Sequence, residues 1–181
     1  PGVDAVICAP GNPGIASAAR CLPADVSSPK ELLAVAESQD VDLTVVGPEL
    51  PLSRGVVDAF TAVGRAIVGP TKAAAALEWS KAFAKNFMAR HRVPTAAFRV
   101  CESADEALAT IRRGEFTFPL VLKADGLAAG KGVVIAEDAP TAEAVIGAMM
   151  IDRRFGDAGS RVVLEEFLVG QEASYFVLAD G

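Results

Sequence analysis

Short apolar runs alternate with helical patterns over the first part of the chain. The runs cover residues 4–9, 41–47 and 65–69, and the helical patterns cover residues 28–39 and 53–64. The runs show no period-two alternation, which is typical of strands buried on both faces. Strands that alternate with helices at this spacing predict a parallel, Rossmann-like sheet and an α/β fold.

Two further helical patterns follow, over residues 71–78 and 80–91. We expect Ser80 to cap the second of these helices. The apolar positions of that helix recur at helical spacing and are expected to pack: Ala82, Phe83, Phe87 and Met88. Lys81 directly follows the expected cap, where a cation opposes the helix dipole unless an anion lies nearby. Lys81 is therefore a candidate anion contact.

The order of elements changes after these helices, and we place a domain boundary between Pro94 and Phe98. A strand, a helix, two strands, a second helix and two more strands are expected beyond it. The helices are predicted over residues 103–114 and 141–151, and the later strands over residues 118–124, 132–138, 161–168 and 172–180. This mixed order predicts an α+β arrangement for the second part of the chain.

Each apolar run of the first part leads into a loop rich in Gly and Pro. The loops cover residues 9–14, 47–52 and 69–71. In an open parallel sheet such loops meet at the carboxyl edge, where ligands of these folds bind. A single loop of this kind is only a turn, but three at one edge favour a site for a small polar substrate.

The segment KADGLAAGKGVV, residues 123–134, combines two cations with three glycines. It lies between two predicted strands, so we expect a hairpin with a loop over residues 125–130. The spacing fits neither a Walker A loop nor the GxGxxG pattern. Backbone N–H groups and the Lys131 ammonium could cover a phosphate chain. The alternative is a solubilising surface hairpin with Gly turns.

The segment VVLEEFLVGQEAS, residues 162–174, begins within the strand predicted over residues 161–168. A strand that turns outward here exposes backbone N–H and C=O groups beside apolar side chains. That combination suits the edge of an adenine ring, and Glu172 could then bind ribose hydroxyls. A glutamate pair before an aromatic residue is, however, also common on ordinary sheet edges.

Composition and charge exclude several classes of function. The chain has 181 residues, is 51% hydrophobic and carries a net charge of −6, which argues against a nucleic-acid partner. The apolar runs are too short to cross a membrane. The single histidine, His91, excludes a Ser-His-Asp triad and a histidine-rich metal site. Cys8, Cys21 and Cys101 lack CxxC spacing, so a reduced cytoplasmic protein is expected.

Taken together, these segments resemble the ATP-grasp superfamily and, within it, the phosphoribosylamine–glycine ligase family of purine biosynthesis. The resemblance rests on GNPG at residues 11–14, GPELPL at 47–52, the SKAFAK helix from residue 80, KADGLAAGKGV from residue 123 and EEFLVGQEAS from residue 165. Trp79 stands where the family has a small glycine, and Val169 and Gln171 replace residues that are often acidic.

The resemblance implies a set of site residues. ATP would be bound by Lys81, Lys123, Gly130, Lys131, Gly132, Glu165, Glu166, Phe167, Leu168 and Glu172, and phosphoribosylamine by Asn12, Gly14, Gly47, Pro48 and Glu49. It also implies Mg²⁺ or Mn²⁺ with ATP, small-molecule substrates only, and a monomer. No catalytic side chain and no metal ligand is assigned, since the family's metal ligands are expected after residue 181.

The resemblance also implies a division of the chain. Residues 1–70 would form a Rossmann-like substrate-binding domain without its first strand, residues 71–97 linker helices, residues 98–164 the ATP-grasp lid, and residues 165–181 the hinge and the start of the central subdomain. We therefore expect an internal piece of a longer protein, inactive by itself. Two alternatives stay open: another ATP-grasp carboxylate ligase, such as a biotin carboxylase or another purine-pathway ligase, and a non-catalytic nucleotide-binding module.

Overall fold

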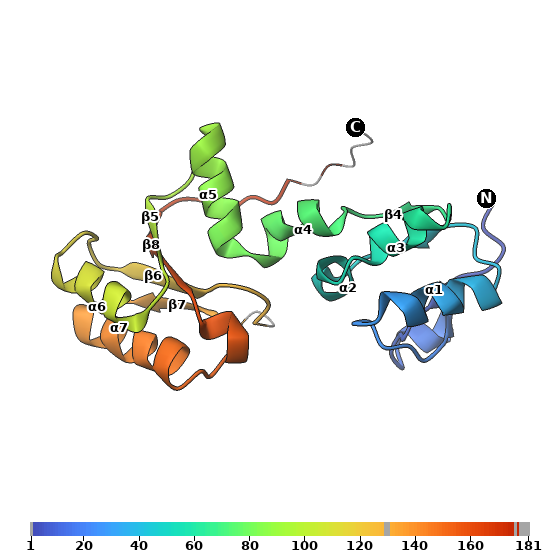
Figure 1. Cartoon of the computed structure of the whole chain (residues 1–181), viewed down its shortest axis with the longest axis horizontal. Coiled ribbons are helices and arrows are strands. Elements are labelled where there is room, and N and C mark those ends of the chain that lie inside the picture. The colour runs from blue at the N-terminus through green and yellow to red at the C-terminus, as the bar shows by residue number, and fades with distance from the viewer. Residues whose placement is uncertain (1, 129–130, 176, 178–181) are drawn as a thin grey trace. The chain divides into compact units, whose positions relative to one another are not determined.

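The computed structural model describes residues 2–128, 131–175 and 177. The chain divides into two compact units, Pro1–His91 and Arg92–Gly181. Each unit has its own hydrophobic core and is described by itself (Figure 1).

Parallel strand pairs form the first unit, as predicted. Strand β1 (Ile7–Cys8) pairs with β2 (Arg20–Cys21), and β3 (Thr44–Val45) pairs with β4 (Ile67–Val68). Each strand has only two paired residues, and no hydrogen-bonded ladder joins the two pairs within the described residues. Strand β2 was not predicted, because two residues are too few to produce a hydrophobic pattern.

The helices of the first unit begin close to where the sequence predicts. They are η1 (Ile15–Ser17), α1 (Pro29–Ser38), α2 (Glu49–Ser53), α3 (Val56–Ala62), α4 (Lys72–Trp79) and α5 (Lys81–His91). The hydroxyl of Ser28 caps α1 by accepting from Glu31 N at 3.3 Å, and Ser80 caps α5 in the same way. The unpredicted α2 replaces most of the loop expected over residues 47–52.

The core of the first unit lies between these helices and the short strands. Phe60 is 1% exposed at its centre, with Val56, Val57 and Ala75 around it. In α5, Ala82 is buried, while Phe83 is 42% exposed and stacks on Phe87 with ring centroids 6.4 Å apart. The hydrophobic spacing did not identify Lys85 as a buried residue of the same helix.

An antiparallel four-stranded sheet organises the second unit. Its strands are β5 (Phe98–Cys101), β6 (Leu120–Ala124), β7 (Val133–Ala136) and β8 (Val162–Glu166), in the order β5-β8-β6-β7. The β6–β7 pairing confirms the predicted hairpin, with a connection that runs from residue 125 to residue 132. It is two residues longer than expected, because the paired part of β7 begins at Val133.

Helices cover one face of this sheet. Figure 1 shows α6 (Ala104–Arg112) and α7 (Ala139–Ile146) together on that face, followed by η2 (Gly147–Ile151) and η3 (Gly156–Gly159). Leu120, Leu122 and Leu164 point toward the helices and are fully buried. The alternation along β6 therefore places Lys123 on the opposite face of the sheet.

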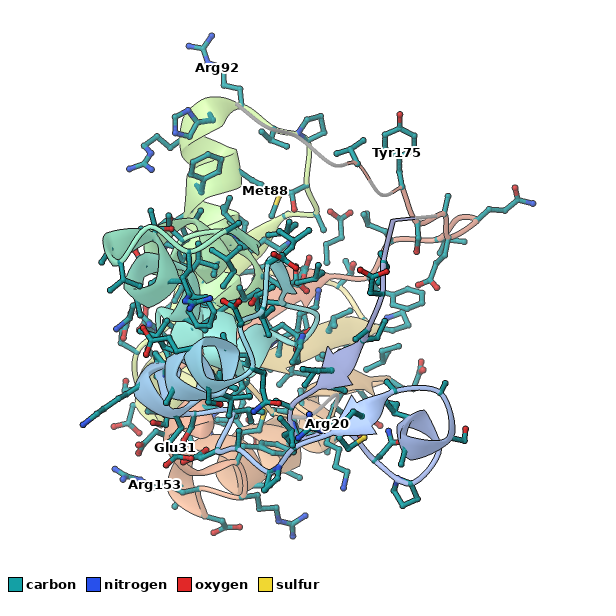
Figure 2. All side chains as sticks on the ribbon, turned by 90° about the vertical axis from the view of Figure 1, so that its right-hand side faces the viewer. Arg20, Glu31, Met88, Arg92, Arg153 and Tyr175 are labelled. Atoms are coloured by element: carbon teal, nitrogen blue, oxygen red, sulfur yellow. The ribbon has the colours of Figure 1, made fainter. Side chains whose placement is uncertain are left out.

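The strand predicted over residues 172–180 is absent from its described part. Residues 172–175 and 177 form no strand, and the remaining residues of this range lie outside the described chain. Figure 2 shows the side chain of Tyr175 projecting away from the ribbon, and it is 89% exposed. Without a neighbouring strand, an alternating pattern alone does not form a ladder.

In the part of the chain that the structure describes, no helix has the length and apolar character needed to span a membrane.

Candidate functional site

Two of the predicted nucleotide contacts, Lys123 and Glu165, lie on the same face of the second unit's sheet. Strands β6 and β8 are antiparallel neighbours, with Lys123 opposite Val163 and Val121 opposite Glu165. This register makes Lys123 and Glu165 diagonal neighbours, and their side chains form an ion pair. The carboxylate of Glu165 is 7% exposed and Lys123 is 28% exposed, so the ammonium keeps access to solvent.

The same sheet face carries exposed apolar side chains. Val133 and Ile135 of β7 are both 47% exposed and lie beside the strand that carries Lys123. A flat apolar surface next to a cation suits a ring joined to an anionic chain, because the ring is desolvated while the anion is paired. This combination is the chemistry that a nucleotide requires.

The loop between β6 and β7 begins at an ion pair with a buried carboxylate. Asp125 is 7% exposed, and its carboxylate accepts from Arg161 Nε at 2.9 Å. The backbone of Asp125 also donates to Arg161 O at 2.9 Å. Gly126 follows with φ +98°, a conformation that side chains rarely adopt. These contacts fix the direction in which the loop leaves the sheet.

The far end of the loop is closely packed. Lys131 N donates to Ala128 O at 2.9 Å, and Ala124 N donates to Gly132 O at 2.7 Å. A Cβ added at Gly132 would lie 2.6 Å from Ala128 Cβ, so only glycine fits there. The Lys131 side chain is exposed. Gly130, the remaining predicted loop residue, lies outside the described residues.

The predicted adenine hinge follows directly from β8. Glu166, its last residue, donates from N to Ala97 O at 2.9 Å and accepts from Ala97 N at 3.2 Å through its carboxylate. The backbone N–H of Glu166 is therefore used inside the unit, because β8 continues through this residue. Phe167 and Leu168 are 37% and 63% exposed, and Glu172 is also exposed.

The predicted contact Lys81 belongs to the first unit, as the first residue of α5. Ser80 Oγ accepts from Phe83 N at 3.2 Å and so caps this helix. Lys85 lies one turn further on and is 7% exposed, although lysine is seldom buried unless it is paired. Spacing of four residues places both lysines on the same side of α5. Lys85 is thus a candidate that the sequence reasoning missed, although the motif SKAFAK contains it.

Trp79 ends α4 just before this helix. The indole packs against the core of the first unit. Its Nε1 is buried and has no hydrogen-bond partner among the described residues. The bulky residue at a position where a small one was expected is thus accommodated by apolar packing.

The predicted amine-substrate residues lie in two loops of the first unit. Asn12 Oδ1 accepts from Ile15 N at 2.9 Å and stabilises the turn that contains Gly14. Glu49 is the first residue of α2 and follows Gly47 and Pro48. All five residues are exposed, as residues that bind a substrate must be.

A cavity of about 360 Å³ lies in the first unit beside these loops. Gly47 and Pro48 contribute to its wall, but Asn12, Gly14 and Glu49 do not. Most of the wall comes from apolar residues of β1, α1, β3 and α3. Such a surface does not suit a phosphorylated sugar, so this cavity is not assigned to phosphoribosylamine.

Arg161 is a second residue that the sequence reasoning missed. Its guanidinium joins Asp125 to Glu102, which lies 3.3 Å from Nη1. No local motif surrounds it, and Asp125 lies 36 residues away along the chain. Only the β6–β8 pairing brings the two together.

No group of three or more His, Cys, Asp or Glu side chains that could hold a metal ion occurs in the described part of the chain.

Comparison with protein families matches the whole chain. Residues 1–78 match the phosphoribosylglycinamide synthetase N domain, and residues 79–181 match the phosphoribosylglycinamide synthetase ATP-grasp (A) domain. Similar proteins named phosphoribosylamine–glycine ligase include those of Ralstonia nicotianae and Xylella fastidiosa. The first is 52% identical over 100% of this chain, and the second 50% identical over 99%. The chain spans 42% of the length of either relative.

Solved structures agree with the sequence relatives. The crystal structure of phosphoribosylamine–glycine ligase from Thermotoga maritima has a TM-score of 0.70 and 31% identity, covering 92% of this chain and 39% of its own. A biotin carboxylase from Campylobacter jejuni has a TM-score of 0.69 at 19% identity, covering 91% of this chain and 40% of its own, which shows the fold alone. From the two family models, which between them match every residue, the chain belongs to the phosphoribosylglycinamide synthetase family.

Proposed function

We propose that the protein joins glycine to 5-phosphoribosylamine with ATP, giving glycinamide ribonucleotide, ADP and phosphate in de novo purine biosynthesis. The observation that carries this proposal is the exposed sheet face of the second unit. There, Lys123, Glu165 and the apolar side chains of β7 meet at the base of a glycine-rich loop. Relatives at about half sequence identity carry the name of this activity.

The second unit supplies the nucleotide contacts in this proposal. Lys123 and Lys131 pair with phosphate oxygens, and the backbone of residues 130–132 covers them. The close packing of Gly132 against Ala128 supports this role only by fixing the conformation of the loop end. Lys81 of the first unit is proposed as a further nucleotide contact.

The hinge residues are proposed to bind the nucleoside. Residues 165–168 hold adenine, with Phe167 and Leu168 packed against the ring, and Glu172 binds the ribose hydroxyls. The exposure of Phe167 and Leu168 supports this assignment. The Glu166 N–H is not included, because it already donates to Ala97.

The first unit is proposed to hold the amine substrate. Asn12, Gly14, Gly47, Pro48 and Glu49 lie in its exposed loops. Residues 1–70 would form this substrate domain, residues 71–97 the linker helices, residues 98–164 the lid over the nucleotide, and residues 165–181 the hinge into the rest of the ATP-grasp domain.

The chemistry follows from the substrates. A glycine carboxylate oxygen attacks the γ-phosphorus of ATP, and ADP leaves. The amine of phosphoribosylamine then attacks the acyl carbon of glycyl phosphate, and inorganic phosphate leaves. The lysines neutralise phosphate charge and fix the γ-phosphoryl group in line with the carboxylate, so catalysis rests on position and charge. No side chain described here acts as a nucleophile.

The residues present fit the triphosphate of ATP, and none of them is assigned to its divalent ion. Two lysines and a glycine-rich loop meet a triphosphate, and Mg²⁺ or Mn²⁺ would supply further neutralisation of its charge when bound. We also propose that the protein works as a cytoplasmic monomer, without nucleic acid or membrane, in agreement with its net charge of −6.

The direct test is ADP release by the full-length protein. MgATP is offered with glycine and phosphoribosylamine, and separately with bicarbonate and biotin. Release that requires both glycine and phosphoribosylamine is expected. Release with bicarbonate and biotin would assign a different carboxylate to the same fold, and no release with either pair would leave only nucleotide binding.

A further inference from the structure

Two of the three cysteines lie directly opposite each other in the first unit. The parallel pairing of β1 and β2 places Cys8 in register with Cys21. Residues in register on neighbouring strands point to the same face of a sheet. Neighbouring strands lie about 4.8 Å apart, which falls within the Cα–Cα range of disulfides, about 4.4–6.8 Å. The backbone therefore already has the separation that a disulfide needs.

The Cβ atoms of the two cysteines both lie near Gly11. A Cβ added at Gly11 would lie 3.0 Å from the Cβ of Cys21 and 3.6 Å from the Cβ of Cys8. Both Cβ atoms are thus close to one point, and Gly11, with φ +77°, leaves room for the sulfur atoms. Cys21 Sγ lies 3.9 Å from Asn12 O, to which its S–H donates weakly.

Both thiols are free and half-buried, so small oxidants can reach them. Cys101 differs, because it is fully buried in the core of the second unit and burial raises its pKa to about 11. It therefore stays a protonated thiol at neutral pH, and the thiolate is the reactive form. Cys8 and Cys21 are thus an accessible pair of thiols, and Cys101 is an unreactive thiol that serves as an internal control.

We propose that Cys8 and Cys21 form an oxidisable dithiol site that closes to a disulfide in the presence of a peroxide. One thiolate attacks an oxygen of hydrogen peroxide, the O–O bond breaks, and hydroxide leaves and is protonated to water. The second thiolate attacks the sulfur of the resulting sulfenic acid, an S–S bond forms, and the sulfenic oxygen leaves as a second water. Two thiols and one peroxide give one disulfide and two waters.

Formation of the Cys8–Cys21 disulfide changes the loop that follows β1. The disulfide removes the S–H that donates to Asn12 O and ties β1 to β2 on either side of Gly11. Figure 2 labels Arg20, the residue of β2 that directly precedes Cys21. The proposal concerns the two sulfurs only and does not depend on the proposed ligase activity.

The test uses tryptic peptides of the full-length protein. Trypsin cuts after Arg20, which separates Cys8 from Cys21, so a disulfide between them appears as two linked peptides. The protein is treated with a small excess of hydrogen peroxide at neutral pH, quenched in acid, and alkylated in denaturant. The expected result is loss of alkylation at Cys8 and Cys21 together, appearance of the linked peptides, and unchanged alkylation of Cys101.

Single variants serve as matched controls. Cys8→Ser and Cys21→Ser should each abolish the linked peptides and leave a sulfenic acid on the remaining cysteine, which dimedone traps. Full alkylation of both cysteines after peroxide, separate sulfinic acids without linkage, or linkage of either cysteine to Cys101 in the native protein would each overturn the proposal.

Discussion

Lys123 and Glu165 form an ion pair across the neighbouring strands β6 and β8. The pair lies on the sheet face that α6 and α7 leave uncovered, with the carboxylate nearly buried and the ammonium partly exposed. Its two members were assigned separately to a nucleotide from the sequence. Their contact means that the charge of Glu165 orients Lys123 before any ligand arrives, and substitutions at either residue affect the other.

The Lys123–Glu165 pair should show coupling in a double-mutant cycle. Lys123→Met, Glu165→Gln and the double variant are compared by urea unfolding of the second unit. Each single change should lower the free energy of unfolding by about 1–3 kcal/mol, because a nearly buried polar group loses a partner. The expected coupling energy is about 1 kcal/mol.

The exposed pair formed by Arg112 and Glu143 is the matched control. Its members are 66% and 38% exposed, so the same cycle should give a coupling energy below about 0.5 kcal/mol. Equal coupling in the two cycles would contradict the structural role given to Lys123 and Glu165.

Lys131 should contribute to the use of ATP and not to the stability of the fold. Its side chain is exposed, so Lys131→Ala should leave the unfolding midpoint unchanged. Loss of a charge-assisted contact to phosphate should lower kcat/KM for ATP about ten- to hundredfold. Lys30→Ala is the control, because Lys30 is also exposed but lies in the first unit. It should change neither the unfolding midpoint nor kcat/KM for ATP. Wild-type ATP kinetics in Lys131→Ala would remove Lys131 from the proposed site.

Gly132→Ala should disturb the end of the loop. The new Cβ would lie 2.6 Å from Ala128 Cβ and 3.3 Å from Ala124 Cβ, so the loop must shift. We expect a loss of about 1–3 kcal/mol in the free energy of unfolding, together with weaker ATP binding. Gly147→Ala, whose Cβ meets nothing within 4 Å, should be neutral or stabilising. Similar losses in both variants would mean that the packing at Gly132 is not specific.

Asp138 gives a pH-dependent prediction. It caps α7, and hydrogen bonds from Thr141 hold the pKa of its carboxyl below the usual 3.8. Because the pKa is lower in the folded state, this cap stabilises the protein above the unfolded pKa and loses that effect as pH falls through the folded one. Asp138→Ala should therefore lower Tm at pH 7, and the difference from wild type should shrink below about pH 4.

Asn is the matched replacement at this cap, since it keeps the accepting oxygen without the charge. Asp138→Asn should have a Tm between those of wild type and Asp138→Ala at pH 7, and the wild-type Tm should approach that of Asp138→Asn as the carboxyl is protonated at low pH. A gap between wild type and Asp138→Ala that stays constant down to pH 2.5 would show that the carboxylate is not what stabilises the cap.

Sequence patterns predicted the second unit more completely than the first. The β6–β7 hairpin and the helices α6 and α7 follow from the apolar runs in FPLVLKA and GVVIAED and from the helical patterns around them. These features depend on residues close together in the sequence. In the first unit, β2 is only two residues long and α2 begins at Pro48–Glu49, so neither produces a periodic signal.

The sequence predicted which residues belong to the candidate site, but it did not predict which of them contact each other. Sequence motifs identify Lys123 and Glu165, yet only strand register shows that they pair. The same holds for Arg161, whose contact with Asp125 depends on a pairing between distant segments. The buried position of Lys85 was missed because hydrophobic spacing assigns a lysine to the surface, whatever tertiary contacts later cover it.

The central claim is that ATP activates the carboxylate of glycine, and an oxygen-isotope measurement tests it most directly. The full-length protein turns over MgATP and phosphoribosylamine with glycine labelled by ¹⁸O in its carboxylate, and the inorganic phosphate is analysed by mass spectrometry. If glycyl phosphate forms, one carboxylate oxygen leaves with the phosphoryl group, so each phosphate carries one ¹⁸O. Phosphate without ¹⁸O, released at the same rate as ADP, would contradict the account.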